Sequence, residues 1–190
     1  MPYNLTKKYP DLLELFGSIY EMKQSLRRIY DRDIENNPDF KFRGIQIHPL
    51  KSEEGQLDMD RTFTHLTTKE YASFDAEGNE LDEKHREFDI QRSKRLHWIN
   101  HHVHEKTPAN IDIFTVVEWD KKKRQDVKHT YIYDRVGKYV IIFDRRAQKD
   151  FYLLTAYYLD APYAEKALKK KMKKKEPEVI SVSYTHLRAH

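Results

Sequence analysis

The sequence predicts an α+β fold, in which an antiparallel four-stranded meander sheet packs with helices and follows a helical N-terminal arm. The first observation is a rapid succession of four strand signals, at 111–119, 128–134, 139–143 and 151–158. The links between these segments are too short for crossover helices, so consecutive strands should pair antiparallel. The second observation is that two upstream segments repeat apolar residues at helical spacing. We therefore expect an arm at 1–43 and an α+β domain at 44–180.

The elements before the sheet are expected in the following order. Residues 10–32 predict a helix, since Leu12, Phe16, Ile19, Leu26 and others share one helical face. Residues 44–49 alternate like a short strand, and 51–82 read as loops with a little structure at 63–66. A second helix is expected over 82–104, before the helix-ending pair Thr107-Pro108.

Two segments follow the last strand. A final helix, 162–174, carries most of a lysine cluster. Residues 181–190 look like translated sequencing-adapter sequence, so we expect a non-native tail and leave it out of functional reasoning.

Composition limits the classes of protein that fit. Hydrophobic residues make up 38% and charged residues 35%, so the core is modest, but 13% aromatic residues add large buried areas. The net charge is only +4, yet residues 166–175 hold seven lysines, which favours a polyanionic partner. The absence of cysteine excludes disulfides and thiolate metal sites. We expect a cytoplasmic protein with no membrane partner, because the chain shows neither a signal peptide nor an apolar run of roughly 20 residues.

Well-known catalytic motifs are missing from the chain. There is no phosphate-binding glycine loop, no GxSxG elbow and no His-Glu-x-x-His. Candidate chemistry must therefore come from scattered residues.

Two arginines and a tryptophan in the second predicted helix are candidates. Arg92 and Arg95 are three residues apart and could clamp a phosphate together. The alternative is a surface arginine pair beside Asp89. Trp98 could stack on a nucleotide base, although a helical tryptophan is more often part of the core or its rim.

Several histidines are candidates as well. His97, His101 and His104 would share one helical face, but no carboxylate lies at ligand spacing, so a solvated histidine face is favoured and no metal is expected. His65 could act as a general acid or base near neutral pH, or it could be a structural histidine.

The strands and their flanks hold the remaining candidates. Thr155 and Tyr157 place a hydroxyl and a phenol in an otherwise apolar strand, on the face predicted for Phe151 and Leu153. His129 should share a face with Tyr131 and Tyr133. Tyrosine and threonine on an exposed sheet face are also ordinary strand-forming residues. Basic residues outside the strands could contact phosphate or be merely solvated, and the main ones are Lys51, Lys169 and Lys170.

Four segments of the chain form a series that resembles a known group of nucleases. It consists of Arg86, Arg92, Arg95 and Trp98 in 86–99, then Thr130-Tyr-Ile-Tyr-Asp134, Tyr139-Val-Ile-Ile-Phe143 and Phe151-Tyr-Leu-Leu-Thr155-Ala-Tyr157. The series resembles the phage-borne nuclease-like domains of the barnase, EndoU, colicin and RelE fold group. The resemblance covers roughly residues 45–175.

The resemblance implies a metal-independent endoribonuclease or toxin-like domain that needs no cofactor. It places Arg92, Arg95 and His97 on the helix, and Thr155 and Tyr157 on the last strand, in the catalytic site. His65 and Lys51 join them if the acidic segment folds over the sheet. RNA is then the expected partner, with an immunity or antitoxin protein as a second candidate. The alternative is a non-catalytic nucleic-acid-binding or phage accessory module.

Overall fold

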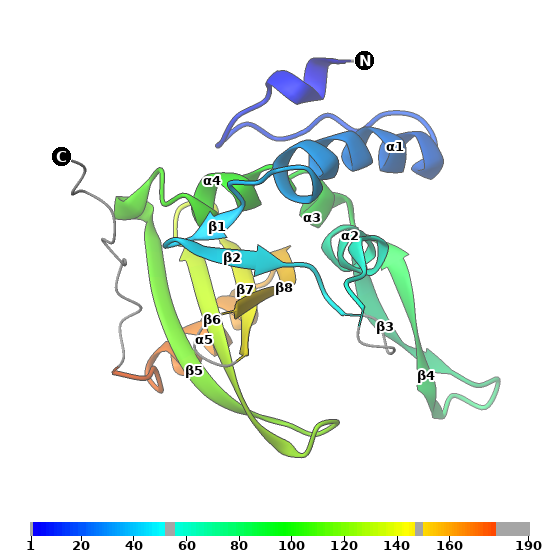
Figure 1. Cartoon of the computed structure of the whole chain (residues 1–190). Helices are drawn as coiled ribbons and strands as arrows, with labels where there is room; N and C mark the ends of the chain where they lie inside the picture. Colours follow the sequence, from blue (N-terminus) through cyan, green and yellow to red (C-terminus); the bar gives the residue numbers. More distant parts are fainter. Residues whose placement is uncertain (1, 52–55, 147–149, 178–190) are drawn as a thin grey trace.

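The fold is described here from a computed structural model, which describes residues 2–51, 56–146 and 150–177 (Figure 1). Its helices are α1 (Ile19–Tyr30), α2 (Met59–Thr67), α3 (Ile90–Ser93), α4 (Trp98–Val103) and α5 (Pro162–Met172). Its strands are β1 (Lys41–Phe42), β2 (Ile45–His48), β3 (Thr68–Phe74), β4 (Glu80–Phe88), β5 (Ile111–Asp120), β6 (Gln125–Asp134), β7 (Tyr139–Arg146) and β8 (Asp150–Tyr158). The tail predicted at 181–190 lies outside the described residues.

The main sheet has six strands in the order β1-β2-β8-β7-β6-β5. Strands β5 to β8 pair antiparallel in sequence order, but β2 joins β8 in parallel through Ile47 and Phe151. The predicted four-stranded antiparallel sheet is therefore wrong in strand number and in direction. The parallel pair joins segments about a hundred residues apart, and local sequence patterns carry no information about such a partner.

The helix predicted over 82–104 is also wrong in its first part. Residues 80–88 form β4, which pairs with β3 in a separate two-stranded sheet. The turn between these strands is closed by Asp75, whose side chain accepts the backbone N–H of Glu77 and Asn79, and by Gly78 with φ of +85°. Such a turn initiates a hairpin. Only the short helices α3 and α4 remain of the predicted helix.

The N-terminal helix begins later than predicted, at Ile19. Gly17 takes a left-handed φ of +86°, and Ser18 and Glu21 form a capping box that begins α1. The helix α2 stands where mostly loop was expected, and the Asp58 side chain caps its first turn. In both places the capping side chain sets the boundary of the helix.

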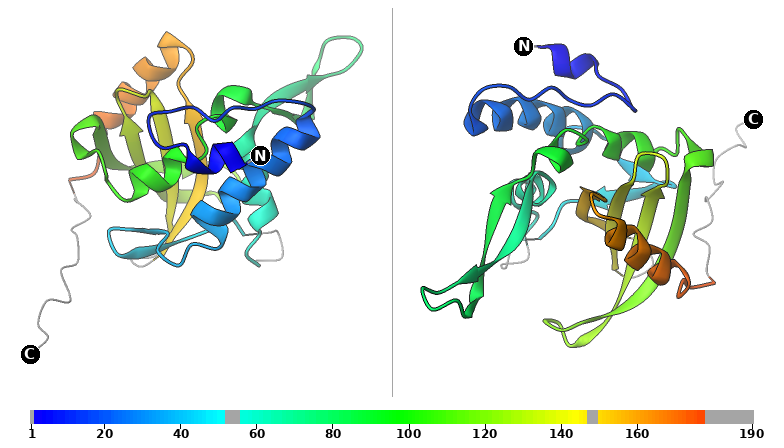
Figure 2. Two further views of the ribbon diagram at one scale, coloured as in Figure 1. Left: turned by 90° about the horizontal axis from the view of Figure 1, so that it is seen from above. Right: turned by 180° about the vertical axis from the view of Figure 1, so that it is seen from behind.

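Two apolar layers cover the two faces of the main sheet. On one face α1 and α4 pack through Leu26 and Ile99 against strand residues such as Phe143. On the other face α5 packs through Leu168 against Phe114 and neighbouring residues. Figure 2 shows α5 on the side of the sheet away from α1. The predicted arm thus shares one core with the sheet.

A buried polar contact joins α4 to the β6–β7 turn. Asp134 is fully buried, its Oδ1 accepts the backbone N–H of Val136 and Gly137, and its Oδ2 lies 3.1 Å from His102 Nε2. Burial alone would raise the pKa of Asp134, but the contacts with His102 and Gly137 outweigh it and lower the pKa. The carboxylate therefore remains charged and holds the turn against Trp98 and its neighbours.

The Gly137→Ala substitution tests this turn. A Cβ at position 137 would lie 2.4 Å from Asp134 Oδ2 and 2.7 Å from Trp98 Cζ3. Such overpacking should lower the free energy of unfolding by about 1–3 kcal/mol, measured by urea unfolding. Val136→Ala is the matched control, because Val136 is exposed in the same turn. Equal stability of the two variants would contradict the proposed packing.

Candidate functional site

The candidate site lies where α2 and α3 meet the free side of β8 (Figure 1). Strand β2 pairs with β8 only at Phe151 and Tyr152, so the rest of β8 has no strand neighbour on that side. Helices α2 and α3 contact β8 there instead. Side chains from all three elements therefore converge at one edge of the sheet.

Arg92 is the centre of this convergence. The Asp89 side chain accepts the backbone N–H of Arg92 and so fixes the first turn of α3. The Arg92 side chain is buried, and its Nη1 donates to the carbonyls of His65 and Thr68, both at 2.7 Å. Nη1 also lies 3.5 Å from Thr155 Oγ1. The guanidinium thereby joins α2, β3 and β8.

The other nitrogens of Arg92 have no hydrogen-bond partner among the described residues. Nε is buried and lies 4.0 Å from Asp89 Oδ2, its nearest carboxylate oxygen. Nη2 is not among the buried unpaired atoms, so it reaches the molecular surface. Burial lowers the pKa of Arg92, but a guanidinium stays protonated in proteins. The site thus offers a charged donor to an anion.

A β-bulge decides which strand residues face Arg92. The pairing of β7 with β8 shifts register, so that Ile142 pairs with Thr155 and Phe143 with Leu153. The extra residue, Leu154, turns Thr155 and Tyr157 away from the core face that holds Leu153. The prediction that Phe151, Leu153, Thr155 and Tyr157 share a face is therefore wrong.

Tyr157 and Thr155 stand together with Arg92. The Arg92 guanidinium lies 5.8 Å from the centre of the Tyr157 ring. Burial raises the pKa of Tyr157, so its phenol remains protonated near neutral pH. Of the two arginines predicted to meet the last strand, Arg92 lies beside Thr155 Oγ1 and the Tyr157 ring, and Arg95 does not.

His65 accepts a hydrogen bond from Arg92 through its backbone carbonyl, while the charges that act most strongly on its imidazole are those of Arg86 and Arg61. It lies half-buried on α2, and burial together with the positive charges of Arg86 and Arg61 lowers its pKa to about 4. Arg86 itself is held by Thr68 Oγ1 and Glu70 Oε2. The imidazole is therefore neutral at pH 7 and can accept a proton. An anion bound beside Arg86 and Arg92 would raise this pKa toward its ordinary value, because it would offset the positive charge.

We call Arg92, His65, Thr155 and Tyr157 the Arg92 cluster. A second group on the same sheet face, the Glu118 cluster, comprises Glu118, His129, Tyr131 and Lys171. Glu118 Oε2 accepts the Tyr131 phenol at 2.8 Å and lies 2.8 Å from His129 Nδ1, and Oε1 lies 2.6 Å from Lys171 Nζ.

The charge of Glu118 links the two clusters. Burial would raise the pKa of Glu118, but hydrogen bonds from Lys171, His129 and Tyr131 outweigh burial and lower it to about 2. The Glu118 carboxylate also helps to raise the pKa of Tyr157. Tyr131 and Thr155 stand in one cross-strand row with Ile142 between them. Sequence reasoning placed His129 and the lysine cluster that includes Lys171 at binding surfaces but missed Glu118, because the contacts that join these three residues are purely tertiary.

Three predicted residues of the helical region lie elsewhere. Arg95 follows the end of α3, and its guanidinium stacks 3.8 Å from the Tyr158 ring centre, toward the other face of β8. The predicted pairing of Arg95 with Arg92 on one helical face is therefore wrong. His97 is buried near Asp33 and the N-terminal segment. Trp98 is 4% exposed and donates its indole N–H to the Asp11 carbonyl, so a base cannot stack on it in this conformation.

The predicted histidine face is not a solvated surface either. His97 is buried and His101 half-buried, while His104 is exposed. Within residues 2–51, 56–146 and 150–177, no group of three or more potential ligands could hold a metal ion. The same residues include no helix long and apolar enough to cross a membrane.

The predicted lysines are spread over two places. Lys51 Nζ lies 5.4 Å from the centre of the Tyr152 ring, near the end of β2. Lys169 pairs with Glu165 at 2.7 Å, and Lys170 is exposed beside it on α5. Lys51 thus lies on the parallel edge of the sheet, whereas the α5 lysines lie on its outer helix.

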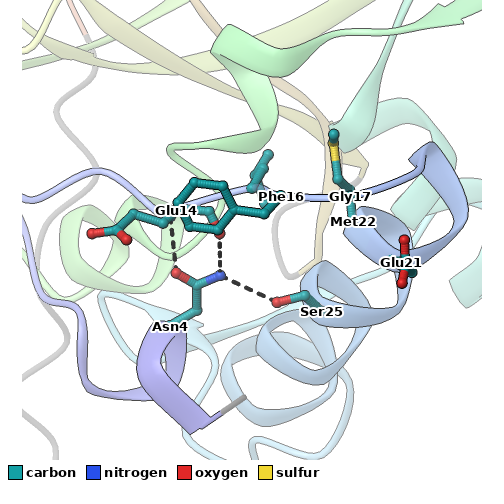
Figure 3. A pocket seen from close by; sticks show the side chains of 8 residues that line it. Asn4, Glu14, Phe16, Gly17, Glu21, Met22 and Ser25 are labelled. Atoms are coloured by element: carbon teal, nitrogen blue, oxygen red, sulfur yellow. Dashed lines mark hydrogen bonds between the residues drawn. The ribbon is translucent and has the colours of Figure 1, made fainter.

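A pocket of about 440 Å³ lies apart from both clusters, between the N-terminal segment and α1 (Figure 3). The Asn4 amide donates to the Glu14 carbonyl and to Ser25 Oγ, and its Oδ1 accepts the Glu14 backbone N–H. Glu21 is engaged in the α1 cap. The polar groups of this pocket are hydrogen-bonded to one another, so we assign the pocket a structural role.

Comparison with known proteins identifies no relative. No family model matches the sequence, and no curated protein or solved structure matches it. The function of the site is therefore inferred from the geometry of its residues.

The buried His97 gives a testable dependence of stability on pH. Burial lowers its pKa to about 4, whereas an unfolded histidine titrates near 6.5. The unfolded chain therefore binds a proton first, and folding stability is lost as the pH falls from about 6.5 toward 4. His97→Gln should reduce the stability lost between pH 7 and 4.5 by about 2 kcal/mol.

Urea unfolding at both pH values measures this loss. His85→Gln is the control, because it removes an exposed histidine from β4 instead of a buried one. The interpretation fails if His97→Gln and the parent chain lose equal stability on acidification.

Proposed function

We propose that the chain is a metal-independent endoribonuclease, a toxin-like RNA-cleaving domain whose catalytic site is the Arg92 cluster. The observation that supports it best is the placement of Nη1 of the buried Arg92 3.5 Å from Thr155 Oγ1, where Arg92 also holds the backbone carbonyl of the half-buried His65. A cation, a hydroxyl and a neutral imidazole are the groups that transesterification at a phosphate needs.

The proposed reaction assigns one role to each group. The His65 imidazole removes the proton from a ribose 2′-OH, whose oxygen then attacks the adjacent phosphorus. Arg92 stabilises the charge that gathers on the phosphoryl oxygens, and Thr155 orients one of these oxygens. The bond to the 5′-oxygen breaks, the protonated Tyr157 phenol donates a proton to that oxygen, and a 2′,3′-cyclic phosphate remains. RNA is the substrate because the attacking group is its 2′-OH.

The proposal also includes the binding partners of the protein and its location in the cell. RNA is the substrate partner, and an immunity or antitoxin protein that covers the Arg92 cluster would be its inhibitor. A cytoplasmic location and an origin in a phage or mobile element belong to the proposal as well.

A second candidate function is nucleic-acid binding without cleavage. It is favoured because Arg92 Nη1 already donates hydrogen bonds to two backbone carbonyls, which is a structural role. A pKa of about 4 also makes His65 a weak base until an anion is bound. The two functions differ in whether RNA is cut.

The test is cleavage of RNA by matched variants in the presence of a chelator. His65→Gln should lower the rate by about 10²–10⁴-fold through loss of the base. Arg92→Lys should lower it by about 10²–10³-fold, because a lysine cannot reproduce the guanidinium geometry. Arg95→Lys is the control for arginine replacement and should stay near the parent rate, because Arg95 faces Tyr158 instead.

Two further readouts make this test decisive. A substrate with 2′-O-methyl groups should bind and remain uncut, and the products from ordinary RNA should end in a 2′,3′-cyclic phosphate. Thermal unfolding of each variant separates lost chemistry from lost folding. Intact RNA at high concentration of folded parent protein would refute the nuclease and leave the binding function.

A further inference from the structure

The tip of the β5–β6 hairpin carries an exposed aromatic surface that the Arg92 cluster does not explain. We call residues 117–126 the hairpin tip. Trp119 is 62% exposed and Val117 is 41% exposed, whereas Trp98, the other of the two tryptophans, is 4% exposed. The hairpin extends away from the rest of the sheet (Figures 1 and 2). An exposed indole on a projecting hairpin can contact a binding partner.

The charge of the hairpin tip is positive and mostly uncompensated. Lys121, Lys122 and Arg124 are exposed, and their side chains have no hydrogen-bond or ion-pair partner among the described residues. Asp126 is the carboxylate of the tip without such a partner, because Glu118 belongs to its own cluster and Asp120 lies 3.6 Å from Lys123 Nζ. Three unpaired cations against one unpaired anion favour a polyanionic partner.

Basic residues connect the hairpin tip to the end of the sheet where β8 begins. Lys123 Nζ lies 3.3 Å from Asp144 Oδ2 on β7, and Asp144 follows Ile142 on the strand face that also carries Thr155. Arg146 donates to the same carboxylate oxygen and lies 4.7 Å from the centre of the Tyr152 ring. Lys51 lies over that ring as well. The turn is thus tied to the sheet face that bears Thr155, whereas alternation along β5 puts Trp119 on the opposite face, that of Ile111 and Ile113.

We propose that the hairpin tip is a binding site for single-stranded RNA, in which Trp119 stacks on an unpaired base and Lys121, Lys122 and Arg124 contact its phosphates. The inference rests on the proposed function for the choice of RNA as the polyanion. An unpaired strand fits because its bases can turn onto an aromatic ring, whereas those of a duplex are already stacked. The substrate class of the nuclease is then single-stranded RNA that extends beyond the cleavage site.

A protein strand added to the edge of β5 is the rival occupant. β5 is the last strand of the sheet, and Val117 and Trp119 lie on it. The unpaired cations favour RNA, because lysines beside an edge strand oppose pairing with another chain. Strand addition is therefore an outcome to be tested.

The fluorescence of Trp119 provides a direct test. The probe is a short oligouridylate with 2′-O-methyl groups, which the proposed chemistry cannot cut. We expect it to quench the parent protein and to leave Trp119→Phe unchanged, since Trp98 is buried. Trp119→Ala should weaken binding about tenfold, measured by anisotropy of the labelled oligomer. A duplex of equal length should bind at least tenfold more weakly than the single strand.

Two matched variants separate stacking from charge. Lys121→Gln with Lys122→Gln should lower the slope of log affinity against log salt by about 1.4, or about 0.7 per phosphate contact. Tyr20→Ala, which removes an equally exposed aromatic ring from α1, should change neither affinity nor quenching.

The outcomes distinguish this site from the nuclease itself. Binding of the oligomer without a change in Trp119 fluorescence would overturn the hairpin site, even if RNA is cleaved. Quenching without cleavage of ordinary RNA would support the hairpin site and refute the nuclease. A dimer that Trp119→Lys converts to a monomer, with no quenching by the oligomer, would overturn the inference in favour of strand addition.

Discussion

The guanidinium of Arg92 is the constraint on which the site depends. One nitrogen, Nη1, holds the carbonyls of His65 and Thr68, and so joins the end of α2 to the start of β3. The same nitrogen approaches Thr155 on β8. Helices α2 and α3 lie beside this part of β8, where a further strand would otherwise pair. The buried Arg92 guanidinium therefore fixes this edge of the sheet in place of a ladder of backbone hydrogen bonds. The contacts that hold the edge also place a charge where a phosphate could bind.

Burial without full compensation sets the electrostatics of this edge. Two arginines and the loss of water lower the pKa of His65. The Glu118 carboxylate is balanced instead by Lys171 and two hydrogen-bonding rings. The nearest carboxylate to Arg92, that of Asp89, is 4.0 Å from Nε, whereas Glu118 is in direct contact with its cation, Lys171. Under the proposed function, a phosphate bound in the Arg92 cluster would raise the pKa of the His65 imidazole toward its ordinary value.

Particular elements show how far sequence reasoning reached. Strands β5 to β8 were located from their β-branched and aromatic residues and from short links, which are local properties. The meeting of Arg92 with Thr155 and Tyr157 was also inferred. The strand β4 was mistaken for a helix, because its charged residues give no clear period and the decisive signal was the turn at Gly78. Arg95 and His97 were assigned to the site by the resemblance to the nuclease group, which placed them with Arg92 on one helix.

The sequence by itself determined the strands of the meander, the helical character of residues 19–30 and the basic character of the carboxyl-proximal helix, because these follow from neighbouring residues. Only the tertiary structure decided the parallel pairing of β2, the bulge at Leu154 and the union of Glu118 with Lys171. The physical reason is distance along the chain. Such contacts are fixed by packing and by the burial of charge, and no local pattern of residues records which distant partner will satisfy them.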